Sequence, residues 1–355
     1  MQQIIRPEVL ATQAYTVAPA QDCIKLDAME NPYSLPATVQ QQLSSLLGSA
    51  AIHRYPDAAA TALKQQLRNV MQIPAIADVL IGNGSDELIQ IIAQAVATPT
   101  TCLLAPEPGF VMYRQIATSV GCRYHGVALR QPDFGLDMDA MLAAIAHEQP
   151  AVIFIACPNN PTGNLFSDAD LRTLLAAAPG VVVIDEAYYP FTGYSALALL
   201  AEYDHLLVLR TVSKLGLAGL RIGALIAAPA WIAEFDKLRL PYNIGVLNQL
   251  AACAVLEQSD VLAAQVQSIL TERNHLATAL AALPGVQVWP SETNFLLFKL
   301  ANAAAIHQQL RDEGVLIKKL AGSHPALADC LRVTVGTPQE NARFLEVLEQ
   351  LLTNV

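Results

Sequence analysis

The chain has 355 residues, of which 53% are hydrophobic and 15% are charged, and its formal net charge is -10 at pH 7. This length favours two lobes folded together, and the composition excludes a disordered or fibrous chain. The negative charge makes nucleic acid and anionic membranes poor partners. Because the first residues lack the apolar run of a signal peptide or an anchor, we expect a cytoplasmic protein with no membrane partner.

The first 45 residues contain four prolines and cannot build a regular core alone. After Pro241 the pattern changes to long helical stretches, alternating segments at 294–300 and 331–335, and a terminal helix. We therefore predict a large α/β domain at residues 46–244. A small α+β domain is predicted from residues 1–45 together with 245–355.

Between residues 78 and 228, apolar runs of strand length alternate with segments of helical periodicity. This order builds βαβ units and a mainly parallel sheet, with the polar residues in the connections. Ser85 and Ser167 mark the starts of two of the helices. The seven candidate strands cover residues 79–81, 101–104, 123–127, 151–156, 181–184, 206–209 and 222–227.

The first of these strands runs into the sequence IGNGSDE, residues 81–87, which opens an apolar helix. The unpaired N–H groups and the dipole at a helix start form a phosphate cradle, to which Ser85 adds a hydroxyl donor. A dinucleotide-binding fingerprint is the alternative. It is disfavoured because Glu87 occupies the third glycine position of G-x-G-x-x-G and residues 98–104 offer no acid for a ribose.

Two further turns follow buried strands. The sequence PEPGF, residues 106–110, offers Phe110 either as a platform for a flat heteroaromatic ring or as an ordinary core aromatic. The sequence ACPNNPTG, residues 156–163, has the prolines and glycine of a fixed turn, which would direct an asparagine amide into the same crevice. Taken alone, the second motif indicates only a well-formed turn.

An acid ends the next strand in the sequence VVVIDEAY, residues 181–188. Asp185 can pair with a protonated pyridine nitrogen, so that the ring accepts electrons from a substrate carbanion. Tyr188, three residues later, can reach the same crevice and hydrogen-bond a phenolic oxygen of the ring. The alternative for Asp185 is a helix cap or a structural ion pair.

The sequence TVSK, residues 211–214, follows the apolar strand at 206–209. Because ligands are held at strand ends in an α/β sheet, Lys214 is expected to face the crevice. A lysine that is desolvated, or that lies near another cation such as Arg221, can lose its proton and form a Schiff base with an aldehyde. The alternative is a lysine on a surface loop.

Scattered histidines and cysteines argue against a metal site. The seven histidines and six cysteines form no C-x-x-C or H-x-x-x-H pair, the spacings that bring two ligands to one metal ion. We therefore expect no bound metal.

Taken together and in this order, these motifs resemble the fold-type I aminotransferases, which use pyridoxal 5'-phosphate (PLP). The resemblance covers most of residues 25–340. Four further segments are more closely similar to the histidinol-phosphate aminotransferases: DAMENPY at 27–33, RYP at 54–56, RLPYN at 239–243 and LRVTVG at 331–336. The resemblance implies a seven-stranded, mainly parallel sheet in the large domain beside a smaller α+β domain.

The resemblance also implies roles for single residues. Lys214 binds PLP as a Schiff base and shuttles the substrate proton, while Asp185 pairs with the pyridine nitrogen. Tyr188 and Asn160 contact the phenolic oxygen, and Phe110 stacks on the ring. The cofactor phosphate is implied to lie among Ser85, Asp86, Thr211, Ser213 and Arg221.

The implied reaction moves an amino group between L-histidinol phosphate and 2-oxoglutarate, giving imidazole acetol phosphate and glutamate for histidine biosynthesis. Tyr55 is implied to reach into the site of a partner subunit, so the resemblance implies a homodimer with shared active sites. Substrate binding is implied for Arg332, which holds the phosphate, and for Tyr15 and Asn31.

One departure from the family leaves other substrates open. No basic residue lies between Arg6 and Lys25, where some members have an arginine for the substrate phosphate, so Tyr15 is the remaining candidate contact. The alternatives are an aromatic amino acid aminotransferase and, in another reaction class, a threonine-phosphate decarboxylase. A PLP-sensing regulator is disfavoured, because the residues before Asp27 leave no room for a DNA-binding helix-turn-helix.

Overall fold

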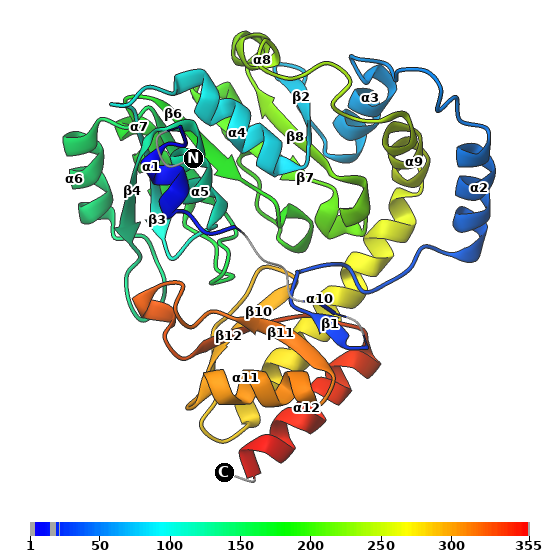
Figure 1. Cartoon of the computed structure of the whole chain (residues 1–355), viewed down its shortest axis with the longest axis vertical. Coiled ribbons are helices and arrows are strands. Elements are labelled where there is room, and N and C mark those ends of the chain that lie inside the picture. The colour runs from blue at the N-terminus through cyan, green and yellow to red at the C-terminus, as the bar shows by residue number, and fades with distance from the viewer. Residues whose placement is uncertain (1–3, 15–18, 21, 354–355) are drawn as a thin grey trace.

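The computed structural model describes residues 4–14, 19–20 and 22–353. These residues form two bodies, each built on one β-sheet, and the long helix α10 (Ser259–Ala282) runs from one to the other (Figure 1). The larger body carries the middle of the chain, and the smaller one contains most of the C-terminal part.

The larger body contains a seven-stranded sheet with the strand order β2-β8-β7-β6-β5-β3-β4. Strand β8 runs antiparallel to both of its neighbours, and the other pairs are parallel. The predicted mainly parallel α/β sheet is therefore confirmed. Its strands are β2 (Asp78–Asn83), β3 (Cys102–Glu107), β4 (Arg123–Ala128), β5 (Val152–Ala156), β6 (Val181–Asp185), β7 (Leu206–Thr211) and β8 (Ile222–Ala227).

Helices cover both faces of this sheet, and for that reason its central strands are mostly apolar. Their polar residues Asp185, Arg210 and Thr211 lie at the strand ends. Every residue of β5, β6, β7 and β8 is buried, as expected of strands without a solvent-facing side. One face packs against α4 (Ser85–Val96), α5 (Met112–Val120) and α8 (Pro229–Asp236). The other packs against α3 (Thr61–Val70), α6 (Met138–Glu148) and α7 (Asp168–Ala177).

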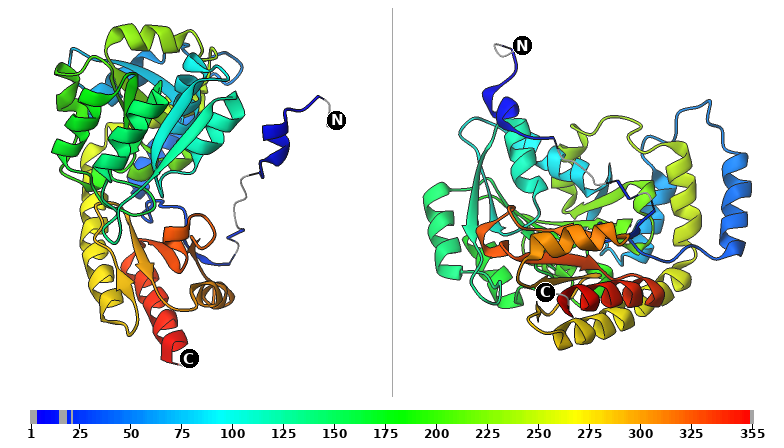
Figure 2. Two further views of the ribbon diagram at one scale, coloured as in Figure 1. Left: turned by 90° about the vertical axis from the view of Figure 1, so that its left-hand side faces the viewer. Right: turned by 60° about the horizontal axis from the view of Figure 1, so that its bottom comes forward.

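The smaller body contains a five-stranded sheet with the order β1-β11-β12-β10-β9, in which only the β1–β11 pair is parallel. Helices α11 (Ala303–Asp312) and α12 (Pro338–Thr353) pack with it (Figure 2). Its strands are β1 (Ile24–Leu26), β9 (Gln287–Val288), β10 (Phe295–Lys299), β11 (Val315–Lys319) and β12 (Cys330–Thr334).

The N-terminal part of the chain contacts both bodies. Strand β1 joins the smaller sheet, whereas α1 (Pro7–Ala11) lies near the end of α5 (Figure 2). Helix α2 (Ala37–Gly48) packs on α9 (Val246–Leu256).

We propose residues 46–244 and residues 1–45 with 245–355 as the two domains, because all strands of the larger sheet fall in the first range and all strands of the smaller sheet in the second.

The sheet topology decides where polar residues collect. Strands β2, β3, β5, β6 and β7 are mutually parallel, so their carboxyl ends meet at one edge of the sheet. Strand β8 runs the other way and begins at that edge, which brings the residue before it to the same place. The connections at this edge are therefore where a ligand site is expected.

A buried ion pair ties β6 to β7 beside this edge. Arg210 donates from Nε to Glu186 Oε2 at 2.9 Å, from Nη2 to Ser195 Oγ at 2.7 Å and from Nη1 to Met71 O at 2.7 Å. Its guanidinium also lies 4.2 Å from the centre of the Tyr189 ring. Both charges are almost fully buried, so each compensates the charge of the other in the interior.

We expect Arg210→Met to lower the free energy of unfolding by about 3–5 kcal/mol, because it leaves the Glu186 carboxylate buried and unpaired. The double variant Arg210→Met/Glu186→Gln should recover part of this loss, because no uncompensated charge remains. Urea denaturation followed by circular dichroism measures both. The control Arg343→Met removes an exposed ion pair and should cost less than about 1 kcal/mol. An equally small cost for Arg210→Met would contradict the assignment.

Candidate active site

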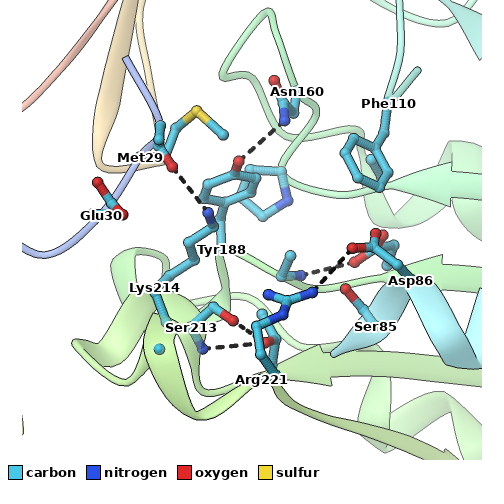
Figure 3. Close-up of a pocket in the computed structure, with 18 residues that line it drawn as sticks. Met29, Glu30, Ser85, Asp86, Phe110, Asn160, Tyr188, Ser213, Lys214 and Arg221 are labelled. Carbon is cyan, nitrogen blue, oxygen red and sulfur yellow. Dashed lines mark hydrogen bonds and ion pairs between the residues drawn. The ribbon is translucent and has the colours of Figure 1, made fainter. Parts of the chain in front are cut away.

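A cavity of about 350 Å³ lies at the sheet edge where the parallel strands end (Figure 3). This volume suits a small molecule. The connections after β2, β3, β5, β6 and β7 line it, together with residues 28–30. The cavity gathers ten of the residues predicted from the sequence: Ser85, Asp86, Phe110, Asn160, Asp185, Tyr188, Thr211, Ser213, Lys214 and Arg221.

Lys214 enters the cavity from a short 3₁₀ turn, Ser213–Leu215, directly after β7. Its amine is 3.4 Å from Ala28 O, and the side chain is partly exposed toward the cavity. Burial, reinforced by the positive charge of Arg332, lowers the pKa of the Lys214 amine from 10.5 to about 8. Near neutral pH it therefore has a much larger neutral fraction than an ordinary lysine, and a neutral amine is the form that attacks an aldehyde.

Asp185 is the last residue of β6 and is buried. Its Oδ1 accepts a hydrogen bond from Ala187 N at 3.0 Å, and its Oδ2 accepts one from the Tyr113 hydroxyl at 2.8 Å. Burial outweighs these two donors and raises the pKa of the carboxyl group from 3.8 to about 6. A cation placed in the cavity beside Asp185 would be strongly favoured, because it would compensate the buried negative charge.

Tyr188 and Asn160 form a polar pair on the wall of the cavity (Figure 3). The Asn160 amide donates from Nδ2 to the Tyr188 hydroxyl oxygen at 3.1 Å. Burial raises the pKa of the Tyr188 phenol well above its usual value, so the phenol stays protonated and can donate to an oxygen in the cavity. Phe110 lines another part of the wall and presents an aromatic ring there.

The start of α4 and the turn before β8 form a tight cradle at one end of the cavity. Gly84 has a positive φ of 80°, and a Cβ on Gly223 would come within 2.6 Å of the Gly84 and Ser85 backbone. These two glycines therefore let the start of α4 approach β8 closely. The Arg221 guanidinium reaches across to Asp86 at 3.3 Å (Figure 3).

Hydroxyl groups complete this cradle. Thr211 Oγ1 is 2.9 Å from Ser213 Oγ and accepts a hydrogen bond from Ser213 N at 3.1 Å. The hydroxyls of Ser85, Thr211 and Ser213, the Arg221 guanidinium and the helix start are the donor set that an anionic phosphate requires.

Three of the predicted site residues that the structure describes do not line the cavity. Tyr55 is 80% exposed and stacks on Tyr242, with ring centres 4.4 Å apart. Asn31 contacts Leu215 O at 3.3 Å and the Gln265 side chain at 2.9 Å. The third is Arg332, described next. The predicted contact Tyr15 lies outside the described residues.

Arg332 lies one layer behind the cavity wall. It is buried on β12 and donates from Nη1 to Asn160 Oδ1 and, at 3.0 Å, from Nη2 to Asp27 O. Its guanidinium also lies 5.2 Å from the centre of the Phe295 ring. Arg332 thus touches the cavity through Asn160, and its charge helps to lower the pKa of Lys214.

Sequence reasoning missed two features of the site. Ala28, Met29 and Glu30 line the cavity, although the sequence marks the segment at 27–33 only through its resemblance to a family. Tyr113, which binds Asp185, lies inside α5 and follows Phe110 by three residues. That spacing, which brings two aromatic residues together at a helix start, is the one signal that could have identified it.

Within 4–14, 19–20 and 22–353, no group of three or more His, Cys, Asp or Glu side chains is arranged to hold a metal ion. Over the same ranges, no helix combines the length and the apolar character needed to cross a membrane.

Comparison with known proteins finds the family described as aminotransferase class I and II over residues 21–348. Histidinol-phosphate aminotransferase 1 of Ralstonia nicotianae is 53% identical over 97% of this chain and 93% of its own length. Histidinol-phosphate aminotransferase 2 of Nitrosococcus oceani is 51% identical over 98% and 97%. These full-length similarities agree with the resemblance found in the motifs.

Among solved structures, the histidinol-phosphate aminotransferase from Sinorhizobium meliloti in complex with pyridoxal-5'-phosphate is similar to this chain with a TM-score of 0.87. The match covers 99% of this chain and 98% of that one at 23% sequence identity. At this identity the match shows a common fold, and it confirms the predicted fold class.

The raised pKa of Asp185 makes the stability of the ligand-free protein depend on pH. Between pH 4 and about 6 the folded chain holds a proton on Asp185 that the unfolded chain has lost, so this contribution to stability is lost as the pH rises through 6. The loss is on the order of 3 kcal/mol. Because Asp185→Asn cannot ionise, we expect it to lack this loss and to be more stable than the parent chain at pH 8.

Urea denaturation of the dialysed protein between pH 4 and pH 8 measures this difference, because the other carboxylates are common to both chains. Asp139→Asn, at an exposed position of α6, is the control and should follow the parent. Parallel pH profiles of the parent and Asp185→Asn would contradict the raised pKa.

Proposed function

Because the chain belongs to the aminotransferase class I and II family and, within it, to the histidinol-phosphate aminotransferases, we propose that it transfers the amino group of L-histidinol phosphate to 2-oxoglutarate. The products are imidazole acetol phosphate and glutamate, the reaction belongs to histidine biosynthesis, and the cofactor is PLP. One observation carries the proposal. In a single cavity the Lys214 amine, with its lowered pKa, meets the buried Asp185 carboxylate and the Asn160–Tyr188 pair.

The donor set of the cavity supports binding of PLP. Lys214 supplies the amine for the cofactor's aldehyde, Asp185 the acid for its pyridine nitrogen, and Phe110 an aromatic face for its ring. Asn160 and Tyr188 supply donors for the phenolic oxygen. The cradle offers the phosphate the start of α4 and the side chains of Ser85, Thr211, Ser213 and Arg221, with the Asp86 backbone in the first turn of the helix.

Each of these groups has a defined task in the reaction. PLP, when bound, supplies a ring that accepts electrons and stabilises negative charge at the substrate Cα. Lys214 removes the proton from that Cα and returns a proton later, which its lowered pKa favours. Asp185 holds a positive charge at the ring nitrogen, and burial strengthens this pairing because water does not screen it.

We assign the substrate's phosphate to Arg332, with Asn31 and Tyr15 as further contacts. The contact of Arg332 with Asn160 brings a fixed positive charge to the cavity wall, and a guanidinium binds a phosphate through two parallel hydrogen bonds. The absence of basic residues between Arg6 and Lys25 is the observation that keeps an aromatic amino acid as the second candidate substrate.

We also propose a cytoplasmic homodimer with shared active sites. Tyr55 and Tyr242 are exposed, and so are Ile52, Leu240 and Leu247 in the same two segments. Exposed apolar side chains gathered in this way favour burial against a second copy, from which Tyr55 would enter the partner's cavity. All six cysteines, which lie in the described part of the chain, are free thiols, as expected in a reducing compartment.

The substrate assignment is tested by kcat/KM for L-histidinol phosphate, phenylalanine and threonine phosphate, each with 2-oxoglutarate, on protein reconstituted with PLP. We expect histidinol phosphate to be preferred by roughly tenfold or more, because its phosphate pairs with Arg332. Lys214→Ala, as the control, should lose roughly a thousandfold in kcat. Equal turnover of phenylalanine would move the function to aromatic amino acids, and CO2 release from threonine phosphate without loss of 2-oxoglutarate would indicate a decarboxylase.

The shared site is tested by mixing two inactive variants, Lys214→Ala and Tyr55→Ala. In a mixed dimer, one site combines both defects, whereas the other has an intact Lys214 and receives an intact Tyr55 from its partner. We expect activity to appear after the two variants are denatured and refolded together. Refolding each variant alone is the control. No gain on mixing, with mixed dimers shown to be present by mass spectrometry, would contradict the exchange of Tyr55.

A further inference from the structure

We propose that Tyr113 is a positioning residue for the reaction: its hydroxyl holds the Asp185 carboxylate in one orientation and in its charged form. This inference rests on the proposed function, in which Asp185 pairs with the cofactor's ring nitrogen. It adds an indirect contact: Tyr113 of helix α5 acts on the cofactor through Asp185 of strand β6.

The Tyr113 ring is held on two sides. It stacks on Phe154 of β5, with ring centres 4.8 Å apart and an angle of 12° between the planes. The edge-on contact with Phe110 has a centre distance of 5.4 Å and an angle of 86°. Only 2% of the side chain is exposed. In a close-packed interior such a ring has one available position, so the place of its hydroxyl is determined as well.

That hydroxyl donates to Asp185 Oδ2 at 2.8 Å, while Oδ1 accepts from Ala187 N at 3.0 Å. With one donor on each oxygen, the carboxylate cannot rotate without breaking a buried hydrogen bond. A hydrogen bond to the charged form of an acid also favours that form. Tyr113 therefore acts on both the orientation and the charge of Asp185.

The Tyr113 hydroxyl opposes the effect of the negatively charged neighbours of Asp185. In addition to burial, the negative charges of Asp86 on α4 and of Glu186, directly after β6, disfavour its ionised form. Tyr188, in the connection after β6, and Lys214, in the connection after β7, line the same cavity. Against these effects stand the Ala187 N–H and the Tyr113 hydroxyl, both of which lower the pKa of Asp185.

Tyr113 remains a hydrogen-bond donor, because its phenol does not ionise readily. Burial and the adjacent Asp185 carboxylate raise the pKa of the Tyr113 phenol far above its usual value. The hydroxyl thus keeps its proton near neutral pH and remains a donor to Asp185. Its ring supports Phe110, the proposed stacking platform, from the side.

The test is Tyr113→Phe in the PLP-bound enzyme, because this change removes the hydroxyl and keeps the ring packing. We expect kcat to fall roughly tenfold to a hundredfold, the range for losing a hydrogen bond to a charged group, with KM changed less than about threefold. Since Asp185 loses a donor, its pKa rises, and the acid limb of the kcat profile should move to higher pH by about one unit. The dissociation constant of PLP, from absorbance titration, should rise about tenfold.

Tyr194→Phe is the matched control. Its hydroxyl is also buried, and no hydrogen-bond partner for it is found among the residues that the structure describes. This change should leave kcat, the pH profile and PLP binding as in the parent enzyme. Thermal midpoints of both variants show whether either change merely weakens the fold.

Two outcomes would overturn the proposal: unchanged kcat, acid limb and PLP affinity in Tyr113→Phe, or a loss of activity explained by a lower thermal midpoint with an unshifted pH profile. The PLP titration needs no substrate. If histidinol phosphate and every other amino donor fail to react, the proposed function falls, while the effect of Tyr113 on cofactor binding is still measured.

Discussion

The carboxylate of Asp185 sits at the end of an apolar strand, where burial raises its pKa to about 6. Across the cavity, burial has the opposite effect on the Lys214 amine and lowers its pKa to about 8. The site therefore contains an acid that would gain from a nearby cation and an amine that readily gives up its charge. The proposed cofactor suits both residues. Its pyridine nitrogen can carry a proton beside Asp185, and its aldehyde reacts with the neutral amine of Lys214.

Much of this arrangement could be predicted because the sheet is covered on both faces. Strands buried on two sides form nearly continuous apolar runs, so the polar residue at or just after each strand end stands out in the sequence. Parallel strands then bring those ends to one edge, as observed for Ser85, Asn160, Asp185 and Lys214. The pattern of the sequence thus identified the strands and the residues of the cavity together.

The remaining contacts depend on which buried groups meet, and periodicity carries no information on that. Tyr113 is 72 residues before its partner Asp185 and lies inside an amphipathic helix, where a tyrosine is an ordinary core residue. Arg332 comes from the other sheet and reaches the cavity only through Asn160. Tyr55 is solvent-exposed in a single chain, so its proposed role requires a surface that one copy of the sequence does not contain.

The side chain of Asn160 bridges the two bodies of the molecule, because its Nδ2 donates to Tyr188 in the larger one and its Oδ1 accepts from Arg332 in the smaller one. An amide has two chemically different ends, so these contacts select one of its two flipped orientations. The smaller body thereby sets the polarity of a group that faces the cavity of the larger one. If the proposed substrate anion drew Arg332 away, that orientation would be released. A movement of the smaller body would then change how Asn160 and Tyr188 hold an oxygen in the cavity.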